Sequence, residues 1–270
     1  MTDREFYRIV RYVATRYGID LSQKKVIVQG RMDNYLANNG FTSYDEYMNN
    51  VEADLSGREA QNMINILTTN HTYFMREPEH FEFLSRVVLP QLKEKNRNTR
   101  DLRIWCGASS TGEEPYTLAM VLKDFFGLDY PNWDTTILAT DISVKVLEKA
   151  VAGIYSRNQV EVLPERWVKA NFKKIDNENY QVKPELKSQV IFRQFNLMDN
   201  LPFKKKLDVV FLRNVMIYFD EETKKNLINR IYDFMEPGGY LFIGATENID
   251  RKETDFRYVR PSVFIKEKSC

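Results

Sequence analysis

An alternation of short β-rich runs with amphipathic helical stretches, starting near residue 102, constrains the fold more than any other feature of the sequence. The candidate strands are Leu102–Trp105, Thr136–Ala139, Val190–Phe195, Leu207–Leu212 and Tyr240–Ile243. Strands that alternate with helices form parallel sheets with crossover connections. Runs such as VVFL, apolar at every position, suit strands that are covered on both faces. We therefore expect an α/β fold with a doubly wound, Rossmann-like sheet.

Two regions depart from this alternation. The N-terminal region contains three hydroxyl-x-x-Glu spacings typical of helix capping boxes, at Thr2–Glu5, Ser43–Glu46 and Ser56–Glu59. Residues from about 154 to 188 contain two β-rich runs around Asp176-Asn177, which predicts an inserted antiparallel hairpin. We expect a small all-α domain over residues 1–72 and the sheet domain over residues 73–270, with this β-subdomain inserted in it.

Charge and composition exclude several classes of function. Lys and Arg number 39 against 38 Asp and Glu, so a nucleic acid is not an expected partner. The sequence has no apolar run of membrane-spanning length and no apolar signal segment at its start, so we expect a cytoplasmic protein that does not insert into a membrane. Two cysteines, Cys106 and Cys270, and two histidines offer no set of metal ligands.

The stretch WCGASSTGEEP has the glycine spacing of a phosphate-binding loop, but acids replace its lysine and hydroxyl. Gly107 and Gly112 would let the backbone approach a ligand at the first strand-to-helix turn. Glu113 and Glu114 follow, and their charge would oppose a pyrophosphate. S-adenosylmethionine carries a sulfonium and an ammonium group and no phosphate, so this turn suits it better.

Later strand ends agree with such a ligand. Asp141 ends the second strand, where a carboxylate accepts hydrogen bonds from ribose hydroxyls. Asn196 and Leu197 follow the third strand, where they offer a polar edge and an apolar face to an adenine. Purely structural explanations stay open: acids are favoured in any first helical turn, and Asp141 could cap the next helix.

Six blocks occur in a fixed order: TTNHTYFMREPEHF (68–81), IWCGASSTGEEPYTLAM (104–120), ILATDIS (137–143), FNLMDN (195–200), FLRNVMIYF (211–219) and GGYLFIGATENI (238–249). Together they resemble the signature blocks of the CheR family of chemotaxis receptor glutamate O-methyltransferases. The resemblance implies a class I methyltransferase sheet. It also implies methyl transfer from S-adenosylmethionine to glutamates on the cytoplasmic signalling helices of chemoreceptors, leaving S-adenosylhomocysteine, in sensory adaptation. We expect a monomer.

The resemblance also implies roles for individual residues. Two residues, Arg76 and Tyr218, are expected beside the methyl acceptor as catalytic residues. Contacts to the donor or the reacting groups are expected from Asn70, Thr72, Arg76, Glu114, Asp141, Asn196, Leu197, Arg213 and Asn214, and the turn adds Gly107. A glutamate side chain is already ionised at neutral pH, so no general base is required. That agrees with the lack of a histidine or cysteine constellation.

Partner contacts are predicted less directly. Basic residues of the helical domain are candidates for docking acidic receptor helices: Arg4, Arg8, Arg11, Lys24, Lys25 and Arg31. Some family members tether a receptor peptide through a glycine-containing loop in the hairpin; residues 173–190 contain no glycine, which argues against such tethering here. Three other functions stay open: methylation of another acceptor, a noncatalytic donor-binding module, and a dinucleotide or ATP enzyme.

Overall fold

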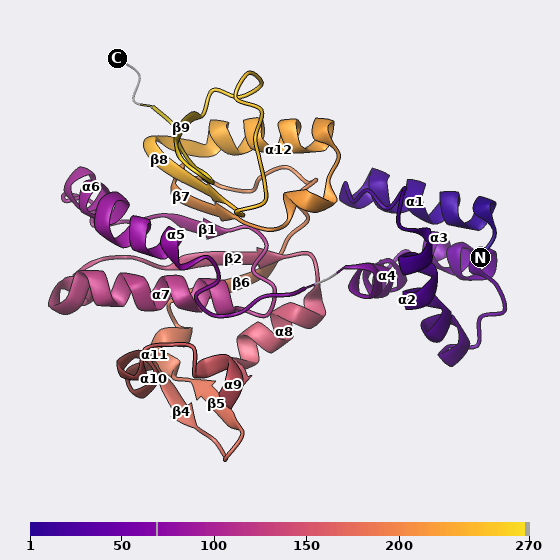
Figure 1. The fold of residues 1–270 in the computed structure, drawn as a ribbon, viewed down its shortest axis with the longest axis horizontal. Helices are drawn as coiled ribbons and strands as arrows, with labels where there is room; N and C mark the ends of the chain where they lie inside the picture. The colour runs from indigo at the N-terminus through magenta and orange to yellow at the C-terminus, as the bar shows by residue number, and fades with distance from the viewer. Residues whose placement is uncertain (69, 268–270) are drawn as a thin grey trace.

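The computed structural model describes residues 1–68 and 70–267 and has three parts (Figure 1). Helices α1–α4 form a group at one end of the molecule. A seven-stranded sheet with helices on both faces forms the centre. A small three-stranded sheet with short helices forms an appendage below it. This confirms the predicted α/β architecture with an N-terminal helical part and an inserted β-subdomain.

The helical part consists of α1 (Asp3–Tyr17), α2 (Lys25–Asn38), α3 (Tyr44–Ala53) and α4 (Arg58–Leu67). Only the first predicted capping box is complete: Thr2 and Glu5 satisfy each other's backbone N–H groups. Ser43 caps α3, but the Glu46 carboxylate accepts from Thr42 instead. The third prediction is wrong.

The N-cap residue of helix α4 is Gly57, which has no side chain that could cap the helix. The Asp54 carboxylate takes the Glu59 backbone N–H at 2.9 Å, which Ser56 was expected to bind. Asp54 also accepts from the Ser56 backbone N–H at 2.9 Å. Asp54, two residues before Ser56, therefore takes the place predicted for the Ser56 hydroxyl, because one carboxylate can accept from several N–H groups at once.

The central sheet has the strand order β6-β2-β1-β7-β8-β10-β9. Its strands are β1 (Ile104–Cys106), β2 (Ile137–Asp141), β6 (Val190–Gln194), β7 (Leu207–Leu212), β8 (Met235–Ile243), β9 (Arg257–Arg260) and β10 (Val263–Ile265). Neighbours are parallel from β6 through β8, whereas β10 runs antiparallel to both β8 and β9. All five predicted core strands are present: β7 has the predicted bounds, and the other four have shifted ends.

Alternate residues of β7 show how the sheet is covered. Val210 and Leu212 belong to a core that includes α12 (Glu221–Phe234) and the helical part, whereas Val209 and Phe211 face a core built with α7 (Glu113–Phe126). The second face also receives α5 (Pro78–Phe83), a π-helical turn (Leu84–Val88) and α6 (Leu89–Lys95). Helix α8 (Val144–Ala152) follows β2. Every residue of β7 is buried, as its apolar run predicts.

The β-subdomain contains the predicted hairpin and one strand more. Strand β5 (Asn179–Val182) pairs antiparallel with β4 (Phe172–Lys174) and also with β3 (Ile154–Ser156), which the sequence analysis did not identify. The short helices α9 (Arg157–Val160), α10 (Glu165–Asn171) and α11 (Pro184–Lys187) complete it. The turn forms because the Asp176 carboxylate accepts the backbone N–H groups of Glu178 and Asn179, both at 2.8 Å.

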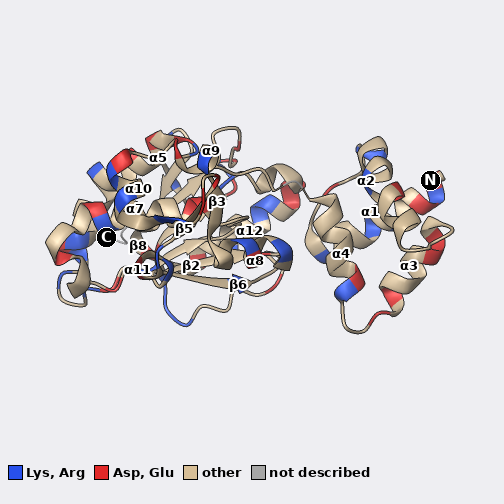
Figure 2. Cartoon of the chain, turned by 90° about the horizontal axis from the view of Figure 1, so that it is seen from below, with Lys and Arg blue, Asp and Glu red and all other residues tan. Residues whose placement is uncertain are grey.

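Basic and acidic residues are interspersed over the helical part and over the rest of the chain (Figure 2). Among the described helices, none combines the length and the apolar character needed to cross a bilayer. Cys106 is a buried free thiol, and Cys270 lies outside the described residues.

Candidate active site

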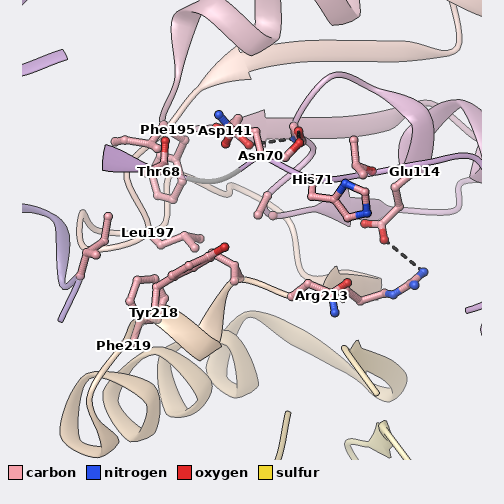
Figure 3. Close-up of a pocket in the computed structure, with 18 of the residues that line it drawn as sticks. Thr68, Asn70, His71, Glu114, Asp141, Phe195, Leu197, Arg213, Tyr218 and Phe219 are labelled. Atoms are coloured by element: carbon pink, nitrogen blue, oxygen red, sulfur yellow. Dashed lines mark hydrogen bonds and ion pairs between the residues drawn. The ribbon is translucent and has the colours of Figure 1, made fainter. Parts of the chain in front are cut away.

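A pocket with an open volume of about 970 Å³ lies at the carboxyl ends of the parallel strands and extends to the helical part (Figure 3). This is the edge at which open α/β sheets bind ligands. All of the predicted site residues line it: Asn70, Thr72, Arg76, Gly107, Glu114, Asp141, Asn196, Leu197, Arg213, Asn214 and Tyr218. The structure thus brings together residues that are spread over most of the sequence.

The glycine turn between β1 and α7 is held tightly from behind. Gly112 has a φ of 97° and caps α7, and a Cβ added there would lie 2.8 Å from the Tyr155 hydroxyl. A Cβ on Gly107 would lie 2.8 Å from the Leu212 side chain. Packing therefore excludes a Cβ at both positions, and Gly112 also needs the conformational freedom of glycine because its φ is positive. The Tyr155 hydroxyl donates to the Thr111 carbonyl at 2.7 Å, so the β-subdomain supports the turn.

The two acids after the turn point in different directions. Glu114 lines the pocket: one of its oxygens accepts from the Cys106 thiol at 3.0 Å, and the other lies 3.1 Å from Nη1 of Arg213. Glu113 is buried away from the pocket, where it accepts from Thr111 and Gln159. The expectation that both carboxylates face a ligand is therefore wrong for Glu113. Consecutive helical residues point about 100° apart, so only one could do so.

Asp141 lies at the end of β2 and is 7% exposed. Its two oxygens accept the backbone N–H groups of Ser110 at 2.8 Å and Ser143 at 2.9 Å. Ser143, not Asp141, caps α8 through the Val146 N–H, so the capping explanation for Asp141 does not hold. Each Asp141 oxygen keeps capacity for a second donor, which is what a diol-bearing ligand needs.

Arg213 is the centre of the polar network. The side chain is buried beside the stacked rings of Phe81 and Phe211, with its guanidinium carbon 5.4 Å and 5.9 Å from the ring centres. Nη2 lies 3.2 Å from a Glu77 oxygen. Nη1 lies 3.1 Å from a Glu114 oxygen, a contact marked in Figure 3. Nε and Nη1 of Arg213 are buried without a hydrogen bond of good geometry, which leaves donor capacity in the pocket wall.

The segment before α5 forms a second wall. The Asn70 carbonyl accepts from the Ser110 hydroxyl at 3.0 Å, and the Arg76 carbonyl accepts from Nη2 of Arg213 at 2.5 Å. Nη1 of Arg76 donates to the His71 carbonyl at 2.8 Å, which bends this side chain over its own loop. Met75 and Glu77 both have positive φ, near 59° and 56°. These bonds to neighbouring elements hold an uncommon backbone in place.

The helical part closes the pocket near Tyr218. The Asp20 backbone N–H donates to the Tyr218 carbonyl at 2.7 Å, and Ile19 forms an antiparallel bridge with Phe219. Nζ of Lys24 lies 5.3 Å from the centre of the Tyr218 ring. The Asn196 side-chain amide donates to the Arg16 carbonyl at 2.8 Å. The Asn196 side chain thus joins the two parts of the molecule. A ligand could still contact the Asn196 backbone and Leu197.

Several lining residues were missed by the sequence analysis: Tyr17, Ile19, Thr68, His71, Ser110, Phe195, Val215 and Phe219. Thr68 and His71 lie within two residues of Asn70, and Ser110 lies inside the glycine turn. Their closeness to these motifs could have identified them as lining residues. Tyr17 and Ile19 have no such signal, because their place depends on how the helical part packs against the sheet. Thr69 lies outside the described residues.

The charge balance of the pocket is less negative than the two consecutive acids suggested. Among the residues that line the pocket, the carboxylates of Glu114 and Asp141 face the guanidinium groups of Arg76 and Arg213, so these charges balance. Glu77 is not part of the lining, but it pairs with Arg213 at 3.2 Å. Burial raises the pKa of Glu114, although Arg213 opposes this effect, and burial raises the pKa of Asp141. Positive charge or N–H and O–H donors from a ligand would offset that desolvation.

Two of the basic residues proposed for docking are already paired within the helical part. Arg8 contacts Asp45 at 3.1 Å and Glu52 at 2.8 Å, and Lys25 contacts Asp3 at 2.5 Å. Arg4 and Arg11 are exposed on α1. A docking surface on this part would therefore be less basic than the count of its Lys and Arg residues suggests.

Comparison with known proteins agrees with this arrangement. Residues 4–68 match the family model described as CheR methyltransferase, all-alpha domain, and residues 70–265 match CheR methyltransferase, SAM binding domain. A chemotaxis protein methyltransferase from Borreliella burgdorferi is 40% identical over 98% of this chain and 95% of its own length. The chemotaxis protein methyltransferase of Escherichia coli is 34% identical over 99% of this chain and 92% of its own length.

Proposed function

The chain belongs to the CheR methyltransferase family, and on this premise we propose that it methylates glutamate side chains of chemoreceptors, with S-adenosylmethionine as the donor. The observation that carries the proposal is that Glu114, Asp141, Arg76 and Tyr218 all line one pocket at the carboxyl edge of the sheet. We further propose residues 1–72 and 73–270 as the domain limits, S-adenosylhomocysteine as the product, and the cytoplasm as the location.

The residues present fit an S-adenosyl donor. When bound, it supplies a methyl group on a positively charged sulfur. Asp141 would accept hydrogen bonds from the ribose hydroxyls, and Leu197 would cover the adenine. Glu114 would face the positive charge of the amino acid end, while the unsatisfied Nε and Nη1 of Arg213 would donate to its carboxylate. Asn70, Thr72, Gly107, Asn196 and Asn214 would complete the contacts.

For the acceptor we propose Arg76 and Tyr218 as catalytic residues. A glutamate on a receptor helix enters as a carboxylate, so the chain has only to orient one oxygen and exclude water. The planar guanidinium of Arg76 can hold a carboxylate, and the Tyr218 hydroxyl can add a directional contact. Arg76 is 27% exposed, so it can reach an incoming side chain from its position over the His71 loop.

The competing functions lack a comparable observation. A phosphate-bearing ligand would meet Glu114 at the first turn and no free lysine on the described pocket wall. A noncatalytic donor-binding module would have no need for both Arg76 and Tyr218 beside the site.

The proposal is tested by incubating the protein with isolated chemoreceptor signalling domains and S-adenosylmethionine. We expect a gain of one methyl group on glutamate residues, located by mass spectrometry and lost after mild base because it is an ester. Calorimetry with S-adenosylhomocysteine, ATP and NAD in parallel should show binding of the first only. Methylation of an amine or amide, or binding of ATP instead, would contradict the proposal.

A further inference from the structure

One carboxylate outside the predicted site binds the backbone of the loop that carries several site residues. Glu247 follows β8 in the GATEN block, is partly buried, and is not among the residues lining the pocket. The loop in question, residues 213–218, connects β7 to α12 and presents Arg213, Asn214 and Tyr218 to the pocket (Figure 3).

Both oxygens of Glu247 bind backbone N–H groups. Oε2 accepts from Gly244 at 2.6 Å and from Asn214 at 2.8 Å. Oε1 accepts from Met216 at 2.7 Å and from Ile217 at 3.2 Å. Three of these four donors belong to the 213–218 loop. A carboxylate that binds several converging N–H groups is a strong, directional anchor, because each of its bonds is charge-assisted.

The loop backbone depends on such an anchor. Asn214 has a φ of 58°, which is uncommon for a residue other than glycine and persists only where the surroundings fix it. The bonds from Met216 and Ile217 cap the start of the 3₁₀ turn Met216–Tyr218, whose N–H groups would otherwise lack partners.

Gly244 and Glu77 fit the same arrangement. A Cβ on Gly244 would lie 2.9 Å from both the Asn214 nitrogen and Oε2 of Glu247, so only glycine permits this approach. Glu77 accepts from the Asn214 side-chain amide at 3.2 Å and from the Ala245 backbone N–H at 3.1 Å. The 244–247 turn, the loop and the Glu77 segment therefore interlock around Asn214.

From these contacts we infer that Glu247 is a positioning residue, which places Tyr218 for methyl transfer without touching donor or acceptor. This inference rests on the proposed function. Arg213 has anchors of its own in Glu77, Glu114 and two aromatic rings. Loss of Glu247 should therefore release the part of the loop from Asn214 to Tyr218. Of the proposed donor contacts only Asn214 lies in that part, so the others should stay in place.

The test compares Glu247→Ala, Glu247→Asp and Glu247→Gln with the parent. A matched control is Glu253→Gln, which changes an exposed acid that pairs with Lys225. We expect Glu247→Ala to lower kcat by about 10- to 100-fold, the effect of a misplacement of about 1 Å. The dissociation constant of S-adenosylhomocysteine, from calorimetry, should change less than about threefold. Glu247→Asp, which keeps the carboxylate, should have an intermediate kcat.

Recovery of kcat on addition of formate distinguishes a positioning role of Glu247 from a purely structural one. Glu247→Ala leaves room for a small carboxylate, and formate bound there can accept from the same N–H groups and draw the loop back, so added formate should restore part of kcat. Glu247→Gln fills that space with an amide and should not respond. The inference is overturned if Glu247→Ala or Glu247→Asp, shown to be folded by circular dichroism, has kcat within twofold of the parent or no larger a loss than Glu253→Gln. A parent that fails to methylate receptor would instead contradict the proposed function.

Discussion

Buried ionisable side chains cluster around Arg213, and their pKa values differ in direction for physical reasons. Burial alone would raise the pKa of Glu77, but the Arg213 guanidinium, the Asn214 amide and the Ala245 N–H together lower it. Glu114 shares the same arginine, yet burial outweighs that attraction and its pKa is raised. Arg213 thus offsets the burial of Glu77 but not that of Glu114. A cationic ligand would therefore stabilise the Glu114 carboxylate more than the Glu77 carboxylate.

His80 makes folding stability depend on pH. Its side chain is 2% exposed, and burial lowers its pKa from 6.5 to about 4, with Arg213 adding to the effect. Between pH 6.5 and 4, His80 is protonated in the unfolded chain but neutral in the folded chain. The free energy of unfolding therefore decreases as the pH falls from 6.5 towards 4. At pH 5 the loss amounts to about 1.5 pH units at ~1.36 kcal/mol each, or about 2 kcal/mol.

The variant His80→Phe should lack this component. Its ring can keep the edge contact with Phe242, and Nδ1 of His80 lies 3.4 Å from a Glu77 oxygen without a hydrogen bond. Urea unfolding at pH 7.5 and at pH 5 measures the difference. We expect the parent to lose about 2 kcal/mol more than the variant between the two pH values. An equal loss in both proteins would show that other groups account for the pH dependence.

At the scale of helices and strands, three glycines form a graded series for stability. Gly112 caps α7 with positive φ, and its missing Cβ would contact Tyr155 and Ala150. Gly57 caps α4 with a φ of 71° in open space, and Gly30 lies inside α2 with ordinary φ and open space. The three positions separate steric overlap, backbone strain and helix propensity.

Alanine at each position should give three different changes in the free energy of unfolding. Gly112→Ala combines strain with overpacking and should cost about 2–4 kcal/mol. Gly57→Ala adds strain only, and should cost about 1–2 kcal/mol. Gly30→Ala removes a flexible residue from a helix, and should stabilise by about 0.5–1 kcal/mol. Equilibrium denaturation measures all three, and a different rank order would contradict this account of the turns.

The elements that the sequence predicted well are those with a local signal. VVFL within β7 is a continuous apolar run, and Gly112 precedes a clear helical pattern, so both were recognised. Strand β3 has three residues after Gly153 and no periodicity, and it exists because β5 pairs with it. The Ser56 cap failed because Asp54, two residues earlier, competes for the same N–H.

The same distinction applies to the candidate site. Motif resemblance placed Glu114, Asp141 and Arg213 on the pocket wall, but nothing near Tyr17 or Ile19 in the sequence marks them as lining residues. Glu247 stood inside a recognised block without a role, because its function depends on backbone N–H groups of a loop some thirty residues earlier. A side chain's contacts with the backbone of a distant segment leave no pattern in the amino-acid sequence.

At the scale of the whole molecule, the helical part and the sheet share one hydrophobic core. Residues of α1, such as Ile9 and Val13, belong to the same buried cluster as Ile228 of α12 and Val210 of β7. Across the junction, Gln61 on α4 donates to the Ile142 carbonyl at 2.9 Å. Both parts supply pocket walls, so separation of the parts would open the site.

This shared core predicts that the two parts unfold together. The three tryptophans, Trp105, Trp133 and Trp167, all lie outside the helical part, so their fluorescence reports on the sheet and the β-subdomain. Circular dichroism at 222 nm reports on every helix. Because buried residues of both parts belong to one cluster, we expect the two probes to give the same midpoint in urea.

Ile19→Ala tests the coupling directly. Ile19 is 8% exposed at the junction, where it forms a bridge with Phe219. Its truncation should cost about 2–5 kcal/mol. If the parts are coupled, both midpoints fall together, and S-adenosylhomocysteine raises both together because it binds only the joined, folded state. If the fluorescence midpoint stays at its parent value while the dichroism curve splits into two steps, the helical part folds independently and the pocket is closed only by docking of two separate units.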